Sequence, residues 1–309
     1  MDPSSVFFVV NPHSRGQKTR KLWEKSYLPK LQATKELTYD FKIADGIGTG
    51  KIAASDAIHD GYSKIVPIGG EGTVNEVVNA IHESKKDIEL GFIRSGTVND
   101  YLHIMNWPET LDEQLQLILN GKSVATPLTL VQGDTDRVAL NMADVGVAAH
   151  VATMASVERR LIWIRSQLRY TLLALMAIKK WKNIPAKVIA DDREINGDLS
   201  LLMTGFSNEI GGYKALPHAD RLGDKMAYVV ANNFSKFQMI KLMGVLEKGK
   251  HSEEIKGISM GYADTIQIEA EHDLLFEVDG EPFSYNSSNV TVKSLPKAIK
   301  VIQPNNDQK

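Results

Sequence analysis

The sequence predicts an α/β domain followed by a mainly antiparallel β domain. Up to about Thr126, short apolar runs typical of strands alternate with helical patterns, which indicates a mainly parallel sheet with helices on both faces. Beyond that point, runs of alternating apolar and polar residues such as "TIQIEAEHDLLFEVDG" indicate an antiparallel sheet. The length of 309 residues also favours two domains, because single cores seldom grow past roughly 250–300 residues.

The strands expected in the first domain are residues 6–10, 38–43, 64–68 and 90–94. A helical pattern follows each of them, and we place this domain at residues 1–127. The second domain takes residues 128–296 and contains one long helical pattern, at residues 158–182. Ligands bind at the carboxyl ends of the strands in such parallel sheets, so the loops that follow the strands are the candidate site.

Composition excludes several classes of function. The formal net charge is −2 and the pI is near 6.5, so no overall positive field favours nucleic acid as a partner. The absence of cysteine excludes disulfides, thiolate catalysis and cysteine-ligated metal centres. The first apolar run follows no basic segment, so it indicates a strand rather than a signal peptide. No apolar run reaches the ~20 residues of a membrane span, and we expect a cytoplasmic protein.

The loop after the third strand, Gly69-Gly70-Glu71-Gly72-Thr73, has the composition of a phosphate-binding turn. It opens an amphipathic helix, and Thr73 with Glu76 predicts a capping box that starts this helix at Thr73. The unpaired N–H groups of a helix N-terminus favour an anion, and glycines let the backbone approach it closely. Glu71 suits this place if Mg²⁺ lies between its carboxylate and the phosphates. Taken alone, the loop is equally compatible with a tight turn that carries a surface glutamate.

The loop after the fourth strand repeats this design. Ser95-Gly96-Thr97-Val98-Asn99-Asp100 brings a glycine, a threonine hydroxyl and an acid three residues after the threonine. Two acid-bearing loops at neighbouring strand ends favour a nucleotide–Mg²⁺ site over two unrelated turns. The segment "DGIGTGKI" resembles a P-loop, but Asp45 replaces the first glycine of that motif and Ile52 replaces its final Ser or Thr. We therefore expect an ordinary turn there rather than one that lines a ligand.

These loops resemble the signature of the diacylglycerol kinase catalytic family, which includes sphingosine kinases and soluble bacterial lipid kinases. "GGEGTVNEVVNAI" is similar to the GGDGT-x-x-E-x-x-N motif of that family. Similar segments follow in the family's order along nearly the whole chain, namely "NPHSRG", "GFIRSGTVNDYL", "LNMADVGVAAHV", "GFSNEIGGYKALPHAD" and "FEVDGEPF". The resemblance implies a Rossmann-like three-layer α/β nucleotide-binding domain and an antiparallel β-sandwich-like domain, as in the NAD kinase and diacylglycerol kinase superfamily. It also implies that a last strand, at residues 297–304, returns to the first domain.

The activity implied by the resemblance is transfer of the γ-phosphate of ATP to a lipid hydroxyl, with Mg²⁺ as the metal. We expect diacylglycerol as the acceptor, and the alternative is another lipid, such as a sphingoid base, ceramide, a polyprenol or phosphatidylglycerol. By the same resemblance, the residues that contact the nucleotide are Asn11, Gly69, Gly70, Gly72, Thr73, Thr97 and Asn99.

The resemblance also assigns the catalytic carboxylates. Glu71 and Asp100 would organise Mg²⁺ and its waters, and Glu281 of the Asp279-Gly280-Glu281 turn would be the general base. This fits the chemistry, because phosphoryl transfer needs positioning, charge neutralisation by a metal and a carboxylate that takes the hydroxyl proton. A hairpin-like turn after an alternating strand can deliver that carboxylate from the second domain.

Three positions depart from the family's pattern. Glu71 stands where the family has aspartate, which shifts its carboxylate by roughly 1.5 Å. Thr129 stands where the family often has an acid of the Mg²⁺–water network. Lys225 replaces a glycine near Asp220 and Asp224, the candidate ligands here for a structural Mg²⁺ that soluble bacterial members hold. A protein that binds nucleotide or lipid with weakened turnover or none is therefore a further alternative.

The helical pattern at residues 158–182 is basic and amphipathic. Seven basic residues and no acid lie between Arg159 and Lys182, with Trp163, Tyr170 and Trp181 among them. Such a helix fits the surface of an anionic membrane, where a lipid kinase meets its substrate. A helix packed on the second domain with a solvated basic face would show the same pattern. We expect a protein peripherally associated with the inner face of the membrane.

Other classes of function receive less support from the sequence. An NAD kinase is disfavoured, because the chain has no counterpart of the GSTAY-type motif of that family. The isolated His103, His150 and His218 lack the spacing of metal ligands. Oligomeric state cannot be read from the sequence, and a homodimer is left open.

Overall fold

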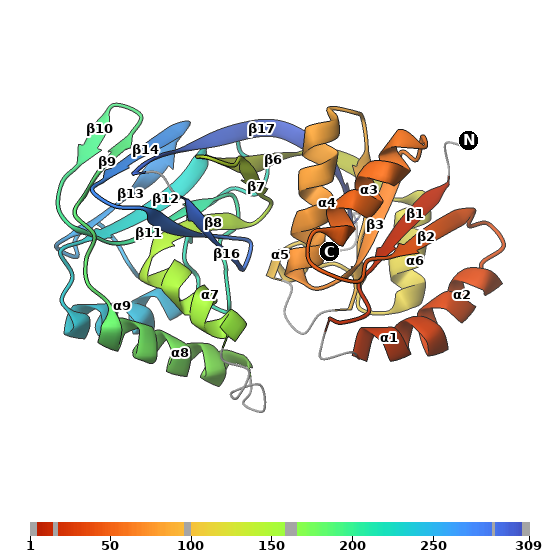
Figure 1. Ribbon diagram of the computed structural model, residues 1–309, viewed down its shortest axis with the longest axis horizontal. Helices are drawn as coiled ribbons and strands as arrows, with labels where there is room; N and C mark the ends of the chain where they lie inside the picture. Colours follow the sequence, from red (N-terminus) through yellow and green to blue (C-terminus); the bar gives the residue numbers. More distant parts are fainter. Residues whose placement is uncertain (1–4, 15–17, 96–99, 158–165, 286–287, 305–309) are drawn as a thin grey trace. The chain divides into compact units, whose positions relative to one another are not determined.

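The structure is a computed structural model that describes residues 5–14, 18–95, 100–157, 166–285 and 288–304 (Figure 1). The chain divides into two compact units, residues 1–126 with 297–309, and residues 127–296. Strand β17 (Asn289–Gln303) contributes to both units. Its first residues pair with β14 (Thr265–Ala270), and Lys300 and Val301 pair with β4 (Glu89–Leu90).

The first unit is built on a parallel sheet with the strand order β2-β1-β3-β4-β17. Besides β4, its strands are β1 (Val6–Val10), β2 (Tyr39–Ile43), β3 (Lys64–Gly69) and β5 (Ile93–Arg94), which pairs with the end of β3. The whole of β1 is buried, as expected of a central strand whose two faces are both covered by helices.

The single strand predicted at residues 90–94 is wrong in detail. The structure has two short strands there, β4 and β5, separated by Gly91 and Phe92. The ring of Phe92 is buried and packs against the rings of Tyr101 and Trp107. The chain thus leaves the regular strand path where it places an aromatic side chain in the core.

Helices cover the parallel sheet. They are α1 (Lys18–Leu22), a π-helical stretch η1 (Trp23–Tyr27), α2 (Leu28–Ala33), α3 (Thr49–His59), α4 (Glu71–Ser84), α5 (Asp100–Ile104) and α6 (Leu111–Asn120). α3 and α4 pack against each other and against β1 and β3 (Figure 1). The connection from β1 to β2 crosses the sheet in the opposite direction to the connections from β2 to β3 and from β3 to β4. Since connections between parallel strands are right-handed, the α1–α2 segment lies on the face of the sheet opposite α3 and α4. The three-layer fold predicted for this region is confirmed.

The second unit contains two sheets. One is fully antiparallel and has six strands, β13 (Ile258–Ala263), β12 (Met226–Asn232), β11 (Leu199–Gly205), β8 (Met142–Gly146), β15 (Leu274–Val278) and β16 (Glu281–Tyr285), in that order. The other has the order β10-β9-β14-β17, and β6 pairs with β17 and β7. Its remaining strands are β6 (Lys122–Gln132), β7 (Arg137–Ala139), β9 (Ala186–Ala190) and β10 (Arg193–Ile195).

One buried apolar cluster takes side chains from both sheets of the second unit. It includes Val188 of β9 and Ile266 of β14 from one sheet, and Val145 of β8, Val230 of β12 and Phe276 of β15 from the other. Two sheets that share a core in this way form a sandwich. The predicted β-sandwich-like domain is therefore confirmed.

Three helices cover the other face of the six-stranded sheet, namely α7 (Val147–Val157), α8 (Ser166–Lys180) and α9 (Lys236–Glu247) (Figure 1). A second buried cluster joins Met203 and Ala231 of the strands to Ile178 of α8 and to Met239 and Leu242 of α9. Strands β8, β11 and β12 are consequently buried on both faces along their whole length. None of the described helices is long and apolar enough to cross a membrane.

Candidate functional site

Three loops of the first unit begin at the same edge of its sheet. β1, β3 and β5 are parallel and paired in register, so Asn11, Gly70 and Ser95 each lie directly past a strand end. These residues belong to the segments that the sequence analysis singles out. The carboxyl edge of a parallel sheet is where ligands bind in α/β folds.

Hydrogen bonds tie the three loops together. The Asn11 Nδ2 group donates to Thr73 Oγ1 at 3.1 Å, and its backbone N–H donates to the carbonyl of Ile68 at 2.9 Å. The Ser95 hydroxyl, which is buried, donates to the carbonyl of Gly69 at 2.9 Å. Asn11 and Thr73, two of the predicted nucleotide contacts, are thus in direct contact with each other.

The two adjacent glycines have different surroundings. A Cβ atom on Gly69 would lie 2.3 Å from Thr73 Oγ1, so only glycine fits against that side chain. At Gly70 no heavy atom of the described residues would lie within 4 Å of a Cβ. Packing within the protein therefore explains the first glycine. The second leaves open space beside the start of α4.

Helix α4 begins earlier than the sequence predicts. Its first residue is Glu71 and its N-cap is Gly70, which makes no side-chain cap hydrogen bond. The predicted capping box of Thr73 and Glu76 is wrong, because Thr73 Oγ1 accepts from Asn11 and Glu76 faces α3. The first N–H groups of a helix have no partner within the helix, so this end of α4 is suited to an anion.

The Glu76 carboxylate closes the P-loop-like segment instead. It accepts hydrogen bonds from the backbone N–H groups of Gly48 at 2.6 Å and Gly50 at 2.8 Å, where α3 begins. A Cβ on Gly50 would lie 2.4 Å from Glu76 Oε2, so the carboxylate fits only against glycine. The N–H groups that would hold a phosphate in a P-loop are here bound to the protein's own anion. These two N–H groups are therefore already bound within the protein.

The predicted Mg²⁺ residues of the first unit both stand at helix starts. Glu71 is half-buried in the first turn of α4, together with Gly72, and Asp100 is buried at the start of α5. Thr97 and Asn99 lie at residues 96–99, outside the described residues. The roles of these residues stay predictions.

The Asp279-Gly280-Glu281 segment forms the predicted hairpin turn in the second unit. Val278 pairs with Glu281, and the two residues between them have φ angles of 50° and 86°, as in a type I′ turn. The Asp279 carboxylate accepts from the backbone N–H groups of residues 140–142 at 2.8, 2.8 and 3.2 Å. Asp279 is buried, whereas Glu281 is exposed. The first carboxylate therefore holds the turn, and the second is accessible from solvent.

A pair of buried carboxyl groups that was not among the predicted site residues lies next to this turn. Asp144 of β8 stands directly opposite Glu277 of β15, and both are more than 90% buried. Burial, and next the charge of Glu277, raise the pKa of Asp144 well above its ordinary value. Burial also raises the pKa of Glu277 to about 7. Charged residues in alternating strands usually face water, but here α7 packs against both strands and covers the pair.

The two acids predicted to hold a structural Mg²⁺, Asp220 and Asp224, lie in the loop before β12. Asp220 Oδ1 accepts from the backbone N–H of Leu222 at 3.0 Å, and the backbone carbonyl of Asp224 accepts from the Ser294 hydroxyl. Within the described residues, no group of three or more His, Cys, Asp or Glu side chains is placed to hold a metal. Asp220 and Asp224 stay predictions as ligands.

Lys225 and Thr129, the other two residues that depart from the family's pattern, differ in their contacts. The Lys225 ammonium is 2.7 Å from Asp264 Oδ2 and 3.4 Å from Asp191 Oδ2, so it pairs with two carboxylates. Thr129 is fully buried in β6, and its hydroxyl has no hydrogen-bond partner within the described part of the chain.

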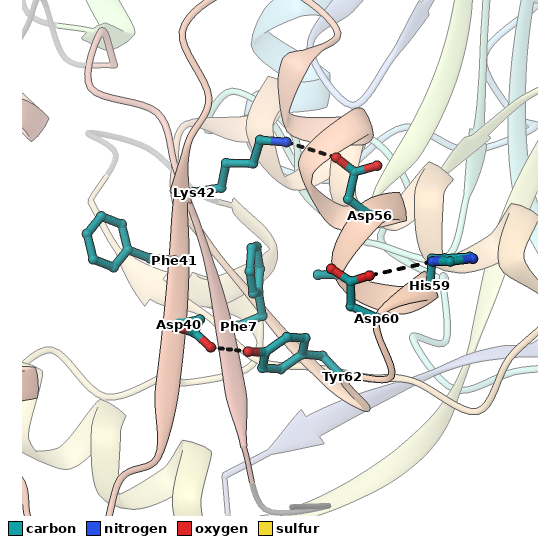
Figure 2. A pocket seen from close by; sticks show the side chains of 9 residues that line it. Phe7, Asp40, Phe41, Lys42, Asp56, His59, Asp60 and Tyr62 are labelled. Carbon is teal, nitrogen blue, oxygen red and sulfur yellow. Dashed lines mark hydrogen bonds and ion pairs between the residues drawn. The ribbon is translucent and has the colours of Figure 1, made fainter. Parts of the chain in front are cut away.

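A groove of the first unit, drawn in Figure 2, contains none of the predicted site residues. It has a volume of about 730 Å³ and lies between β2 and α3. Its polar side chains pair with one another: Lys42 with Asp56 at 2.8 Å, Tyr62 with Asp40, and His59 with Asp60. We assign this groove no function.

Two family models match the chain, and together they cover most of it. The diacylglycerol kinase catalytic domain matches residues 5–131, and the YegS C-terminal NAD kinase beta sandwich-like domain matches residues 141–303. The chain belongs to the diacylglycerol kinase catalytic-domain family. The resemblance inferred from the motifs is thus confirmed, and membership of this kinase family implies ATP as the phosphate donor.

Individual relatives agree with the family. The chain is 26% identical over 260 residues to the diacylglycerol kinase of Staphylococcus aureus (strain NCTC 8325 / PS 47), which covers 84% of this chain and 80% of the relative. A crystal structure of a diacylglycerol kinase from Bacillus anthracis str. Sterne has a TM-score of 0.72 at 16% identity over 99% of this chain and 98% of that one. A second structure from that organism has a TM-score of 0.76 at 18% identity over 99% of both chains. These structures share the fold of this family member.

Proposed function

We propose that this protein is an ATP-dependent lipid kinase that transfers the γ-phosphate of ATP to the hydroxyl of diacylglycerol and so forms phosphatidic acid. The observation that carries the proposal is the start of α4, whose N-cap residue Gly70 has no side chain to cap the helix and lies at the carboxyl edge of a parallel sheet. A helix N-terminus in that position is suited to phosphate oxygens. The family and the Staphylococcus aureus relative support a lipid as the acceptor.

The residues around this edge fit a nucleotide. The open space beside Gly70 allows a phosphate to approach the backbone, and the Asn11–Thr73 hydrogen bond fixes two polar side chains next to it. We therefore assign the phosphates of ATP to Gly69, Gly70 and Gly72, with Asn11 and Thr73 as further contacts. Thr97 and Asn99 of the neighbouring loop complete the proposed set.

Glu71 and Asp100 are the proposed Mg²⁺ residues. Their oxygen donors suit this ion, which is usually held by one or two carboxylates together with substrate phosphates and waters. When bound, Mg²⁺ would neutralise part of the charge on the phosphates of ATP. Asp220 and Asp224 are proposed for a separate, structural ion in the second unit.

The proposed general base is Glu281. In the reaction, the lipid hydroxyl oxygen forms a bond to the γ-phosphorus, and the bond from that phosphorus to the β–γ bridging oxygen breaks. The hydroxyl proton passes to the Glu281 carboxylate, and ADP leaves with the bridging oxygen. Asp279 supports this step by holding the turn that carries Glu281, through its three hydrogen bonds to residues 140–142.

An assay with γ-labelled ATP and a panel of lipids tests the proposal. The panel contains diacylglycerol, a sphingoid base, ceramide, a polyprenol and phosphatidylglycerol, and NAD serves as a soluble acceptor. We expect label in phosphatidic acid. Label in another lipid would support a lipid kinase with a different acceptor. Label in NADP would contradict the proposal of a lipid kinase.

A catalytically impaired nucleotide- or lipid-binding protein is the second candidate. It is favoured by Glu71 and by Thr129, a buried hydroxyl where the family often has an acid. Glu71→Asp and Thr129→Asp test it: a competent kinase should change little, whereas an impaired one should gain activity. ATP binding without label in any acceptor would identify the binding protein.

We also propose a cytoplasmic location with peripheral association at the inner face of the membrane. The acceptor of a lipid kinase stays in the bilayer, so the protein must reach the membrane surface to act on it. Cell fractionation tests this location: we expect the protein in the membrane fraction at low salt and its release at high salt.

A further inference from the structure

Helices α8 and α9 lie side by side on the outer face of the six-stranded sheet of the second unit (Figure 1). Ile178 of α8 and Met239 and Leu242 of α9 point into the buried cluster beneath them. The Lys236 ammonium donates to the backbone carbonyl of Lys179, which joins the start of α9 to the end of α8. The two helices therefore present one common outer surface, which we call the α8–α9 surface.

Apolar side chains are exposed on this surface. Leu175 and Met176 of α8 are 38% and 43% exposed, and Phe237 and Ile240 of α9 are 65% and 45% exposed. Four of the ten large apolar side chains that are exposed among the described residues thus stand on these two helices. Single exposed apolar residues are ordinary on protein surfaces, but several on two adjacent helices favour a contact surface.

The same surface is strongly basic. Residues 171–182 and 236–248 contain six lysines and one acid, Glu247, which gives a net charge of +5 in a chain whose overall charge is −2. All six are exposed, and they are Lys179, Lys180, Lys182, Lys236, Lys241 and Lys248. The Lys241 ammonium lies 4.5 Å from the centre of the Phe237 ring, so charge and aromatic surface are intermixed.

We propose that the α8–α9 surface docks on an anionic lipid bilayer. Exposed apolar side chains can enter the boundary between headgroups and acyl chains, while lysines extend their long side chains to the lipid phosphates. Each lysine near an anionic surface strengthens binding about fivefold. A protein partner fits less well, because interfaces between proteins are depleted in lysine.

This surface differs from the one expected from the sequence. The sequence pattern predicts membrane binding on residues 158–182 alone, and residues 158–165 lie outside the described residues. The exposed apolar and basic residues of α9 supply the other half, and they are brought to α8 only by the fold. The inference rests on the proposed membrane association and assigns it to a surface, and docking can be measured without turnover.

Vesicle sedimentation with the full chain tests the inference. The probes are vesicles of phosphatidylcholine alone and of phosphatidylcholine mixed with phosphatidylglycerol. We expect binding to the mixed vesicles only, and weaker binding as salt is raised. The charge variant K180E/K241E should bind at least about 25-fold more weakly. The apolar variant F237S/I240S should lose about tenfold.

Matched control variants separate this surface from a general effect. I47S/I52S removes two exposed apolar side chains of the first unit, and K122E/K256E reverses two exposed lysines elsewhere. Both controls should bind the mixed vesicles like the unchanged protein. Circular dichroism checks that every variant folds, which we expect because all the substituted side chains are exposed.

Three results would overturn the inference. They are equal binding of the unchanged protein to both kinds of vesicle or to neither, surface variants that bind as tightly as the controls, and a change of molecular mass in F237S/I240S that shows a second copy covering this surface. Kinase activity on diacylglycerol in detergent micelles is measured in parallel. An inactive protein that binds anionic vesicles contradicts only the proposed function, and an active protein that ignores them contradicts only the docking surface.

Discussion

The Glu76 carboxylate of α4 accepts a 2.8 Å hydrogen bond from the backbone N–H of Gly50, the second residue of α3. A second bond, from the N–H of Gly48, is 2.6 Å long. One side chain thus satisfies the start of a neighbouring helix and joins two helices that pack on the same sheet. It also removes the P-loop-like segment from the set of phosphate sites and leaves the start of α4 as the candidate.

Replacing Glu76 should destabilise the first unit without touching the site at the start of α4. Glu76→Ala leaves two backbone N–H groups without their charged acceptor, and we expect a loss of about 2 kcal/mol in the free energy of unfolding. Urea denaturation measures this loss. Glu83→Ala is the control: it breaks an exposed 2.7 Å ion pair with Lys51 and should cost less than about 1 kcal/mol. Equal losses in the two variants would contradict the interpretation.

The two glycines before α4 should respond differently to alanine. Gly69→Ala forces Thr73 away and breaks its contact with Asn11, so we expect a loss of about 1–3 kcal/mol in stability. Gly70→Ala has open space and an extended backbone that alanine adopts, so stability should stay within about 0.5 kcal/mol.

ATP binding distinguishes the two variants further. A methyl group at residue 70 would occupy the space that we assign to phosphate, so Gly70→Ala should weaken ATP binding on the order of tenfold, as measured by calorimetry. Unchanged affinity for ATP in a folded Gly70→Ala protein would place the phosphates elsewhere.

Much of the fold can be predicted from the sequence because its signals are local. The run "VFFVV" predicts β1 with its bounds, and the Asp279-Gly280 pair predicts a two-residue hairpin turn. The change from long helical patterns to short alternating runs predicts the change from an α/β unit to a sandwich. Each of these signals depends on residues that are close in the chain.

The remaining features depend on residues that the fold brings together. Glu76 stands three residues after Thr73, so the local pattern predicts a capping box, but its true partners are 26 and 28 residues away. Asp144 and Glu277 look like the polar positions of two alternating strands. They are buried in the fold, where α7 packs against both strands. Local periodicity carries no information about which helix covers a strand.

Substitutions of Asp279 and Glu281, the two acids of the hairpin turn in the second unit, should affect stability and activity differently. Asp279→Ala removes the acceptor of three backbone N–H groups, and we expect a loss of about 2–4 kcal/mol in the free energy of unfolding. Glu281→Gln changes an exposed side chain and should leave stability within about 0.5 kcal/mol. If Glu281 is the general base, the kcat of the Glu281→Gln protein should fall on the order of 10²–10⁴-fold.

Denaturation and the labelled-ATP assay together check this pair. Asp273→Asn, at an exposed position before β15, is the control and should change neither quantity. Full activity in Glu281→Gln would remove this residue from the mechanism. An Asp279→Ala protein as stable as the unchanged one would show that the hydrogen bonds to residues 140–142 contribute little.

The Asp144–Glu277 pair should make the protein less stable as pH rises from about 4.5 to about 7. Glu277 has its pKa raised to about 7 by burial, so the folded state binds more protons than the unfolded state in this range, and the free energy of unfolding falls with pH. Glu277→Gln should flatten this slope and gain on the order of 1–3 kcal/mol near pH 7 relative to pH 4.5. Urea denaturation across this range measures the difference between the two proteins. Burial lowers the pKa of His251, so this residue makes the free energy of unfolding rise with pH. Its contribution is the same in both proteins and is removed when they are compared. Parallel curves for the two proteins would show that the pair titrates alike in the folded and unfolded states.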